Sequence, residues 1–450
     1  MWPISNSGRI DGLIVFRALG GAYVPLGELR FQGSGVRRQG RFVYARSYLA
    51  RAEKKPVDPI GLPLRSKSVA ADPEEVPLVF HDVGPDGWGK EILTHAFPGL
   101  TLGMPEFLAL GGLGRTGDLA FGPTPDGPER WVPDDEPLLD LPSDDDELET
   151  LMRAAAAVDA GDAEGHHFKL LFRKSADVGG ARPKTRIRHE GKDWIAKFPT
   201  WSDTFDNPRL EAVCLDVAEA AGVPVPEHRI IVAGGKAALF VRRFDRSETD
   251  QPFGYISAAT LLKRPSTEYA TTMTYLDIAT VARTIGVHDP ERGLYRRLLL
   301  NAYLHNTDDH LHNHALIDKG SGWELSPAFD IVPHPDGRRH ICAPAPGIGP
   351  EWNPDRAFEA HASLKISKGE AEAIRDEVLA AARRLPEFMD LRAVSARDRE
   401  TLKDAFPAAV GFSTRTGATL ERRPSTMTTP SHRESAPEGP SSSPIDPARP

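Results

Sequence analysis

The chain has 450 residues with a formal net charge of −9, and 26% of its residues are charged. A chain of this length can form two or three domains with buried cores, and no apolar run in it is long enough to cross a membrane. Its two cysteines exclude a disulfide-rich secreted protein and favour the reducing cytoplasm.

The negative charge is concentrated in one segment. Residues 126–149 contain eleven acidic residues and one arginine, so the rest of the chain is near neutral. The net charge therefore argues neither for nor against an anionic partner.

Residues 1–100 are predicted to be rich in β-structure and to form a structural or partner-binding module. Asp86 is placed to cap a helix over residues 88–96. Three short runs rich in Val, Phe and Tyr are typical of strands: residues 13–16, 29–31 and 41–48.

A segment rich in Pro and Asp follows. Residues 123–142 are predicted to be a surface linker. Ser143, followed by three aspartates, is expected to begin a helix over residues 148–158, because acidic residues in a first turn suit the helix dipole. We assign residues 101–165 to an acidic linker and a connecting helix.

A glycine turn opens the next part of the chain. Gly-Gly-Ala-Arg-Pro-Lys at 179–184 precedes a predicted hairpin with strands at 185–189 and 194–198. Such a turn lets backbone N–H groups approach phosphate oxygens with no side chain between. It is not a Walker A loop, because Pro183 stands before Lys184 and a strand follows. The alternative is an ordinary hairpin turn.

Lys197 lies within an apolar strand-like run. A lysine in this setting needs a partner for its ammonium group, and Glu211, near the start of a helix predicted over residues 210–221, is placed to supply it. The alternative is an edge-strand lysine that reaches water. Two more strands are predicted at 229–232 and 238–244.

The most polar stretch near a buried element is 303–330. An apolar helix ends in a loop that carries Asp308 and Asn313, and Asp330 follows later. Phosphoryl transfer needs one carboxylate to orient a hydroxyl group, with an amide and a second carboxylate to hold magnesium. The five-residue interval from Asp308 to Asn313 is that of kinase catalytic loops.

Two other interpretations of this loop stay open. Polar loops between helices are often only solvated turns. A histidine metal centre is the second, although no Cys or Glu completes a recognised ligand spacing. Its candidate ligands are His305, His310, His312 and His314.

Everything after Phe253 is predicted to be helical, and the end of the chain to be a disordered tail rich in Pro, Ser and Thr. Ser367 and Glu370 are expected to form a capping box. The predicted helices cover 275–285, 290–305, 368–385 and 396–406.

The order of these parts resembles the HipA family, the serine/threonine kinases of bacterial toxin-antitoxin pairs. The motifs that carry the resemblance are Gly-Pro-Asp-Gly-Trp-Gly at 84–89, Gly-Gly-Ala-Arg-Pro-Lys at 179–184, Ala-Lys-Phe-Pro at 196–199, Arg-Arg-Phe-Asp-Arg at 242–246, Asn-Thr-Asp-Asp-His-Leu-His-Asn at 306–313 and Leu-Ser-Pro-Ala-Phe-Asp at 325–330. The resemblance implies an α+β, two-lobed protein-kinase-like fold with a β-rich N-terminal half and an all-helical C-terminal lobe. In chain order this gives a HipA N-terminal module at 1–100, a kinase N-lobe core at 166–246, a helical C-lobe at 247–415 and a tail at 416–450.

The resemblance also implies roles for single residues. Asp308 would be the catalytic aspartate, Asn313 and Asp330 would hold Mg²⁺, and Lys197 would contact the phosphates of ATP. The nucleotide-binding set would further include Gly179, Gly180, Ala181, Arg182, Pro183 and Lys184 over the phosphates, Arg242, Arg243 and Phe244 at the adenine, and His310 and Phe329 at the border of the nucleotide.

The implied activity is that of a Mg-ATP-dependent protein serine/threonine kinase, the toxin of a toxin-antitoxin pair. Its substrate would be a Ser or Thr of a translation component such as an aminoacyl-tRNA synthetase. Its partner would be a HipB-like helix-turn-helix antitoxin, with DNA bound only through that antitoxin, in the cytoplasm and away from membranes. The alternatives are a nucleotide-binding pseudokinase that acts as a partner-binding module and a metal-dependent hydrolase that uses the histidines.

The chain departs from the family pattern at two places. Asp177 stands where many relatives carry an autophosphorylated serine, with Ser175 two residues earlier, and a carboxylate has about half the charge of a phosphoserine. Because Asp177 cannot be phosphorylated as a serine is, self-inactivation by phosphorylation is in doubt. His312 stands where many relatives have lysine, which removes a fixed positive charge.

Overall fold

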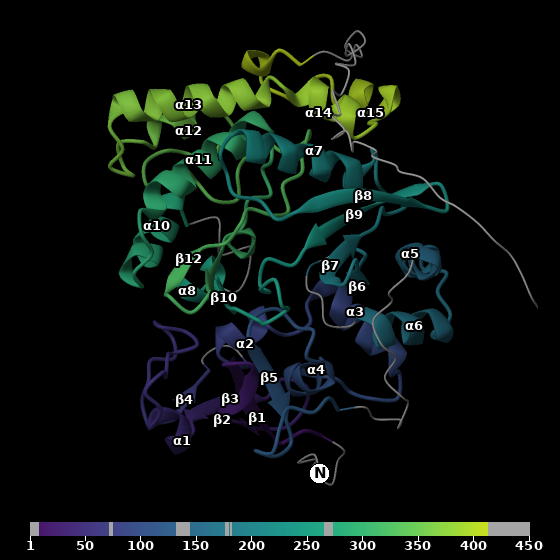
Figure 1. Cartoon of the computed structure of the whole chain (residues 1–450), viewed down its shortest axis with the longest axis vertical. Coiled ribbons are helices and arrows are strands. Elements are labelled where there is room, and N and C mark those ends of the chain that lie inside the picture. Colours follow the sequence, from purple (N-terminus) through teal and green to yellow (C-terminus); the bar gives the residue numbers. More distant parts are fainter. Residues whose placement is uncertain are drawn as a thin grey trace, which may run out of the picture. The chain divides into compact units, whose positions relative to one another are not determined.

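The computed structural model describes residues 9–71, 75–131, 145–175, 180, 182–264 and 273–412 (Figure 1). All of them belong to the first of two units, Met1–Thr416, and the second unit, Gly417–Pro450, lies outside the described residues together with the predicted tail. Among the described residues, no helix combines the length and the apolar character that a membrane crossing needs.

The first sheet is antiparallel with the order β4-β3-β2-β1-β5. Its strands are β1 (Gly12–Leu19), β2 (Ala22–Gln32), β3 (Gln39–Tyr44), β4 (Val69–Ala70) and β5 (Leu119–Gly122). The three predicted strands are present, but the third ends at Tyr44, and a short helix α1 (Arg46–Leu49) follows in which the Tyr48 hydroxyl donates to Lys55 O at 2.8 Å. The sheet also extends past residue 100, since β5 pairs with β1.

Three helices accompany this sheet: α2 (Leu78–Asp82), α3 (Gly87–Ala96) and α4 (Met104–Leu110). The predicted cap of α3 is confirmed, because the Asp86 carboxylate accepts a hydrogen bond from Gly87 N at 2.8 Å. Farther along, α5 (Asp145–Asp159) covers the predicted connecting helix, and α6 (Gly165–Ser175) precedes the glycine turn. Ser143 and most of the linker lie outside the described residues.

The second sheet has four antiparallel strands in the order β6-β7-β9-β8. They are β6 (Lys184–His189), β7 (Lys192–Lys197), β8 (His228–Ala233) and β9 (Lys236–Arg242), with α7 (Asn207–Ala220) between β7 and β8 in sequence. Helix α7 packs against β8 and β9 on one side and against α13 and α14 on the other (Figure 1). The predicted hairpin, the helix and the two later strands are therefore confirmed.

Side-chain alternation places the second sheet between two cores. Trp194, Ala196 and Phe240 join the core of the first sheet, whereas Leu239 and Val241 join the core built on α7. Successive residues of a strand point to opposite faces, so one sheet can serve both cores. The N-terminal part is consequently packed onto the sheet that carries Lys197 rather than joined to it by a linker alone.

The remaining part is largely helical and contains a third sheet. Its helices are α8 (Ala258–Leu261), α10 (Tyr275–Thr284), α11 (Pro290–Tyr303), α12 (Pro354–Glu359), α13 (Lys368–Ala382), α14 (Leu385–Leu391) and α15 (Ala396–Thr401), with 3-10 turns at Leu311–Asn313 and Ala408–Val410. The third sheet, of order β10-β11-β12, consists of Gly254–Ser257, Ala315–Asp318 and Trp323–Leu325.

The prediction of an all-helical C-terminal lobe is therefore wrong. The central strand β11 has four buried residues and pairs with β10, whose partner Ser257 precedes Ala315 by 58 positions. A short buried run of this kind has no distinguishing periodicity, so only its distant partner identifies it as a strand. The predicted helix over 368–385 also ends earlier, and α14 begins as a separate helix with a proline in its first turn.

The predicted capping box at α13 is half formed. The Ser367 hydroxyl accepts a hydrogen bond from Glu370 N at 3.4 Å. The Glu370 carboxylate binds Arg292 of α11 instead of returning to the backbone of Ser367.

Candidate active site

Lys197 lies at the centre of the site. Its ammonium group contacts Glu211 Oε1 of α7 at 2.6 Å and Asp330 Oδ1, in the segment after β12, at 2.7 Å. The side chains of Lys197 and Glu211 are 15% and 7% exposed, so the ion pair is shielded from bulk water. A lysine in an apolar strand requires a charged partner, and Lys197 has two carboxylate partners. Its pair with Glu211 is the one predicted from the sequence.

The charges of this cluster reinforce one another. Burial alone would lower the pKa of Lys197, but the carboxylates of Asp330 and Glu211 outweigh it and raise that pKa above its ordinary value. In turn, the Lys197 ammonium holds the pKa of Asp330 well below its usual range. Burial raises the pKa of Glu211 despite the attraction of Lys197. Lys197 and Asp330 are therefore both ionised at neutral pH.

Asp330 is held in an unusual backbone conformation. Its φ is 59°, in the left-handed region that only a few percent of non-glycine residues adopt. Two residues earlier, Ala328 N donates to Pro224 O at 2.7 Å and fixes this segment beside the end of α7. Residues in such conformations persist where surrounding contacts determine them, often at functional sites.

Asp308 lies in the loop after α11. Burial raises its pKa, the charges of His310 and His334 lower it, and the negative charge of Asp330 raises it. The two aspartates therefore lie within electrostatic reach of each other. The Asn313 side chain holds this loop, because its Nδ2 donates to Asp308 O at 2.9 Å. His334 was not predicted, since nothing in its sequence context marks it as a neighbour of Asp308.

Asp309 is a second residue that the sequence did not single out. Its buried carboxylate accepts hydrogen bonds from the Tyr275 hydroxyl at 2.8 Å, His340 Nδ1 at 3.1 Å, Ile341 N at 3.0 Å and Cys342 N at 3.4 Å. Asp309 thus anchors the loop that carries Asp308 to α10 and to the segment at 340–342. The only sequence signal was the doubled aspartate.

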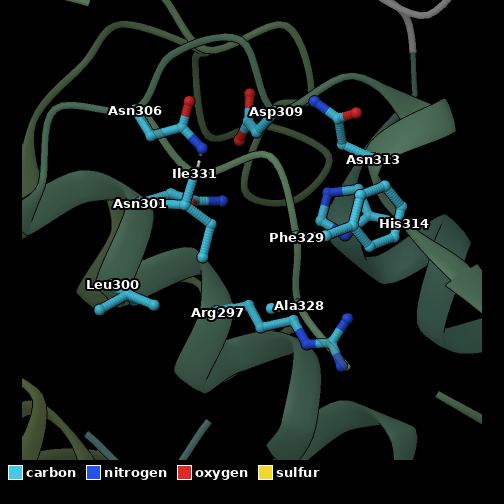
Figure 2. A pocket seen from close by; sticks show the side chains of 10 residues that line it. All are labelled: Arg297, Leu300, Asn301, Asn306, Asp309, Asn313, His314, Ala328, Phe329 and Ile331. Carbon is cyan, nitrogen blue, oxygen red and sulfur yellow. Dashed lines mark hydrogen bonds between the residues drawn. The ribbon is translucent and has the colours of Figure 1, made fainter. Parts of the chain in front are cut away.

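A small cavity lies behind this loop. Its volume is about 20 Å³, enough for about one water molecule and far too small for a nucleotide. Figure 2 shows the polar side chains around it, which include Asn301, Asn306, Asp309 and Asn313. A larger cavity of about 440 Å³ lies near the first sheet, and the predicted site residues do not line it.

The glycine turn is described in part. Gly180, Arg182, Pro183 and Lys184 are described, whereas Gly179, Ala181 and Asp177 lie outside the described residues. Lys184 is buried opposite Lys197 in the β6–β7 pair. Burial and the nearby Lys197 lower its pKa to about 8, against the attraction of Asp330 and Glu211. Arg182 forms an ion pair with Asp203.

The predicted adenine-binding segment contributes one ring to the cluster. Phe244 stacks on Phe329, with ring centroids 5.3 Å apart and planes at 30°. The Arg243 guanidinium is buried elsewhere, bound to Asp245, and Arg242 binds Glu248 at 3.1 Å. The side chains of these two arginines are therefore not brought to Lys197 and Asp330.

The four histidines do not form one cluster, although the rings of His310 and His312 lie edge to face with their centroids 5.9 Å apart. His305 contacts the carbonyl groups of Ala405 and Gly337, and His314 packs against Tyr275. The charge of His312 acts on His81 and Asp82 of α2, while His310 acts on Asp308 and Asp330. In the described part of the chain, no group of three or more His, Cys, Asp or Glu residues could hold a metal ion. The described residues thus give no support to a histidine metal centre.

The donors that are present suit magnesium better than a transition metal. The Asn313 amide uses its nitrogen within the loop, which leaves its oxygen Oδ1 as the atom available to a cation, and Asp330 offers a carboxylate. Mg²⁺ prefers oxygen ligands and is usually held by one or two carboxylates together with substrate phosphates. The residues at this site therefore fit a magnesium ion that shares its ligands with a nucleotide.

The comparisons with known proteins agree with this architecture. Residues 176–385 match the family described as HipA-like C-terminal domain. The chain resembles a chain in the solved complex of Shewanella oneidensis MR-1 toxin-antitoxin proteins HipA and HipB with operator DNA, with 15% identity, a TM-score of 0.57, and coverage of 85% of this chain and 90% of that chain. The similarity to the Helicobacter pylori proinflammatory kinase CtkA, with 13% identity, a TM-score of 0.35, and coverage of 52% of this chain and 93% of that chain, is too remote to support an argument. A comparison with curated proteins found no match.

The expected resemblance and the mixed helix-and-sheet fold are thus confirmed. Residues 176–385 are similar to the HipA-like C-terminal domain family, and along most of its length the chain has the fold of the matched chain in the Shewanella HipA–HipB–DNA complex.

Proposed function

We propose that this protein is a Mg-ATP-dependent protein serine/threonine kinase, with its N-lobe core at 166–246 and its C-lobe at 247–415. One observation carries the proposal: Lys197 of β7 contacts both Glu211 and Asp330 within 2.7 Å. A strand lysine paired with a helix glutamate, and a metal-binding aspartate in place beside them, are what an active protein kinase needs.

In the proposed reaction Asp308 orients the hydroxyl group of a Ser or Thr and takes its proton. The hydroxyl oxygen bonds to the γ-phosphorus of ATP as the bond from that phosphorus to the β–γ bridging oxygen breaks, and ADP leaves. Asn313 and Asp330 would hold a magnesium ion, which would neutralise charge on the phosphates. Lys197, Lys184 and the turn at Gly180 face the phosphates, and Phe244 with Phe329 borders the adenine.

The raised pKa of Asp308 supports its assignment as the base. A carboxylate binds a proton more strongly when burial and a second negative charge disfavour its ionised form. Asp330, whose pKa is lowered by Lys197, is instead suited to stay charged as a metal ligand. The two aspartates thus have environments that separate their roles.

The decisive experiment is transfer of label from radiolabelled ATP, with magnesium, to proteins of a bacterial lysate. Asp308→Ala and Asp330→Ala are expected to abolish the transfer, while Asp336→Ala, at an exposed aspartate of the nearby loop, keeps it. Equal transfer by all variants would contradict the proposal. If ATP stabilises the wild-type protein against heat but no label is transferred, the protein is a nucleotide-binding pseudokinase.

The proposal includes a partner and a substrate class. The similar Shewanella structure contains HipA, HipB and operator DNA, so we propose a HipB-like helix-turn-helix antitoxin, with DNA bound only through it, in the cytoplasm. The substrate would be a translation component such as an aminoacyl-tRNA synthetase. Identification of the labelled lysate protein by mass spectrometry tests the substrate, and co-purification with a co-expressed candidate antitoxin tests the partner.

A further inference from the structure

Trp88 of α3 contacts both ends of the described glycine turn. Its backbone N donates to Gly180 O at 2.9 Å, and its indole Nε1 donates to Lys184 O at 3.0 Å. Trp88 is 2% exposed and belongs to the core of the first sheet. A residue about 90 positions earlier in the chain therefore holds the backbone on which the proposed phosphate site is built.

The start of α3 is suited to this contact. The first backbone N–H groups of a helix have no partner within the helix. Asp86 accepts from Gly87 N, and Trp88 N is left to donate to Gly180 O. Helix α3 packs on α6, and α6 packs on β6, so the donor and the turn are both fixed to the same group of elements.

The glycine turn also determines where the Lys184 ammonium group lies. Gly180 has a φ of 97°, a conformation that favours glycine, and a Cβ atom there would clash with Lys184 Nζ. Lys184 therefore folds over Gly180 while its carbonyl group is held by Trp88. Across the strand pair it faces Lys197, and opposite residues of antiparallel strands point to the same face.

We propose that Trp88 is a positioning residue for nucleotide phosphates: it holds the backbone at Gly180 and Lys184 so that the two lysines face Asp330 together. This inference rests on the proposed function. It makes the N-terminal part, which the sequence marked only as a structural or partner-binding module, a component of the phosphate site. Trp88 itself touches no reacting atom in this scheme.

The test compares Trp88→Phe with Trp194→Phe. The first removes the indole bond to Lys184 O, and the second removes an indole bond to His189 O at 3.1 Å, at the other end of the same hairpin. Loss of one buried hydrogen bond is expected to weaken ATP binding by Trp88→Phe about fivefold, while adenosine binding and the affinities of Trp194→Phe stay near wild type. In kinetic assays the KM for ATP should rise by the same factor, with kcat within about twofold.

A measurement without nucleotide separates this inference from the proposed function. Amide hydrogen exchange at residues 180–187 of the free protein should be about fivefold faster in Trp88→Phe than in wild type and unchanged in Trp194→Phe. Gly180→Ala, which leaves the core around Trp88 intact, should lower ATP affinity without lowering adenosine affinity.

Failure of the proposed function and failure of the role proposed for Trp88 would give different results. A wild-type protein that binds neither ATP nor adenosine overturns the proposed function and the phosphate role of Trp88 with it. A wild-type protein that binds ATP, with an unchanged ratio of ATP to adenosine affinity in Trp88→Phe, overturns only the role of Trp88.

Discussion

Lys197 Nζ lies 2.7 Å from Asp330 Oδ1, although the two residues are 133 positions apart. This contact joins the second sheet to the segment after the third sheet. The same lysine binds Glu211, and the charge of Asp330 acts on Asp308. Strand lysine, helix glutamate and both aspartates thus belong to one electrostatic cluster.

Replacing the lysine should destabilise the protein. Lys197→Met leaves the carboxylate of Glu211 buried without its partner, and loss of one member of a buried pair costs about 3 kcal/mol. The double variant Lys197→Met/Glu211→Leu should recover most of this loss. Urea unfolding of wild type, both single variants and the double variant measures the coupling, and additive effects would contradict a direct Lys197–Glu211 interaction.

The aspartate of the loop should be required for chemistry but not for binding. Asp308→Asn keeps the size of the side chain and removes its ability to accept a proton, so kcat should fall at least 100-fold. ATP affinity should stay within about threefold, because Asp308 is assigned to the hydroxyl group rather than to the nucleotide. Isothermal titration and steady-state assays separate the two effects, with Asp336→Asn as the control.

ATP affinity should depend on pH through Lys184. Burial and the nearby Lys197 lower the pKa of its ammonium from 10.5 to about 8, so the group loses its proton as the pH rises through this value. ATP affinity should then fall by up to about tenfold for each pH unit above 8. Lys184→Met should bind ATP more weakly at pH 7 and show no such slope. Titrations between pH 7 and 9.5 test this, and a slope shared by both proteins would rule out Lys184 as the origin.

The free energy of unfolding should rise with pH, whereas ATP affinity falls. The unfolded chain binds a proton at Lys184 up to about pH 10.5, whereas the folded protein loses it near pH 8. Below pH 8 the folded protein therefore carries the free-energy cost of a buried Lys184 ammonium group. This cost disappears as the pH rises from 8 to 10.5. Lys184→Met should accordingly be more stable than wild type at pH 7 and equal to it near pH 11, as measured by the free energy of unfolding.

Asp309 should be needed to hold the loop. Asp309→Asn keeps one acceptor oxygen but places an amide group among the donors of Tyr275, Ile341 and Cys342, which leaves buried donors without partners at a cost of about 2 kcal/mol. We expect a lower melting temperature and a lower kcat together. Tyr275→Phe, which removes one donor, is the milder companion, and an unchanged melting temperature in Asp309→Asn would contradict the anchoring role.

Magnesium should be the activating ion, with Asn313 among its ligands. Asn313→Ala removes one oxygen ligand, so the concentration of Mg²⁺ that gives half-maximal activity should rise at least tenfold. Activity should vanish with EDTA and return with Mg²⁺. Stoichiometric zinc in the purified protein would instead favour a hydrolase that uses the histidines.

The order of the parts and the residue types of the site could be predicted from local sequence patterns. A lysine within an apolar strand requires a charged partner wherever it is placed, and the spacing of Asp308 and Asn313 is local, so both could be recognised without coordinates. The strands around Lys197, helix α7 and the cap of α3 were predicted for the same reason, because alternation, helical periodicity and capping act within a few residues.

The contacts between distant segments, in contrast, follow only from the packing of the folded chain. Strand β11 is identified by its pairing with β10, Asp309 by its bonds to α10 and to residues 340–342, and Trp88 by its bonds to Gly180 and Lys184. A hydrogen-bonding group shows in the sequence that it needs a partner, but not which partner it finds, because that depends on how the remote segments pack.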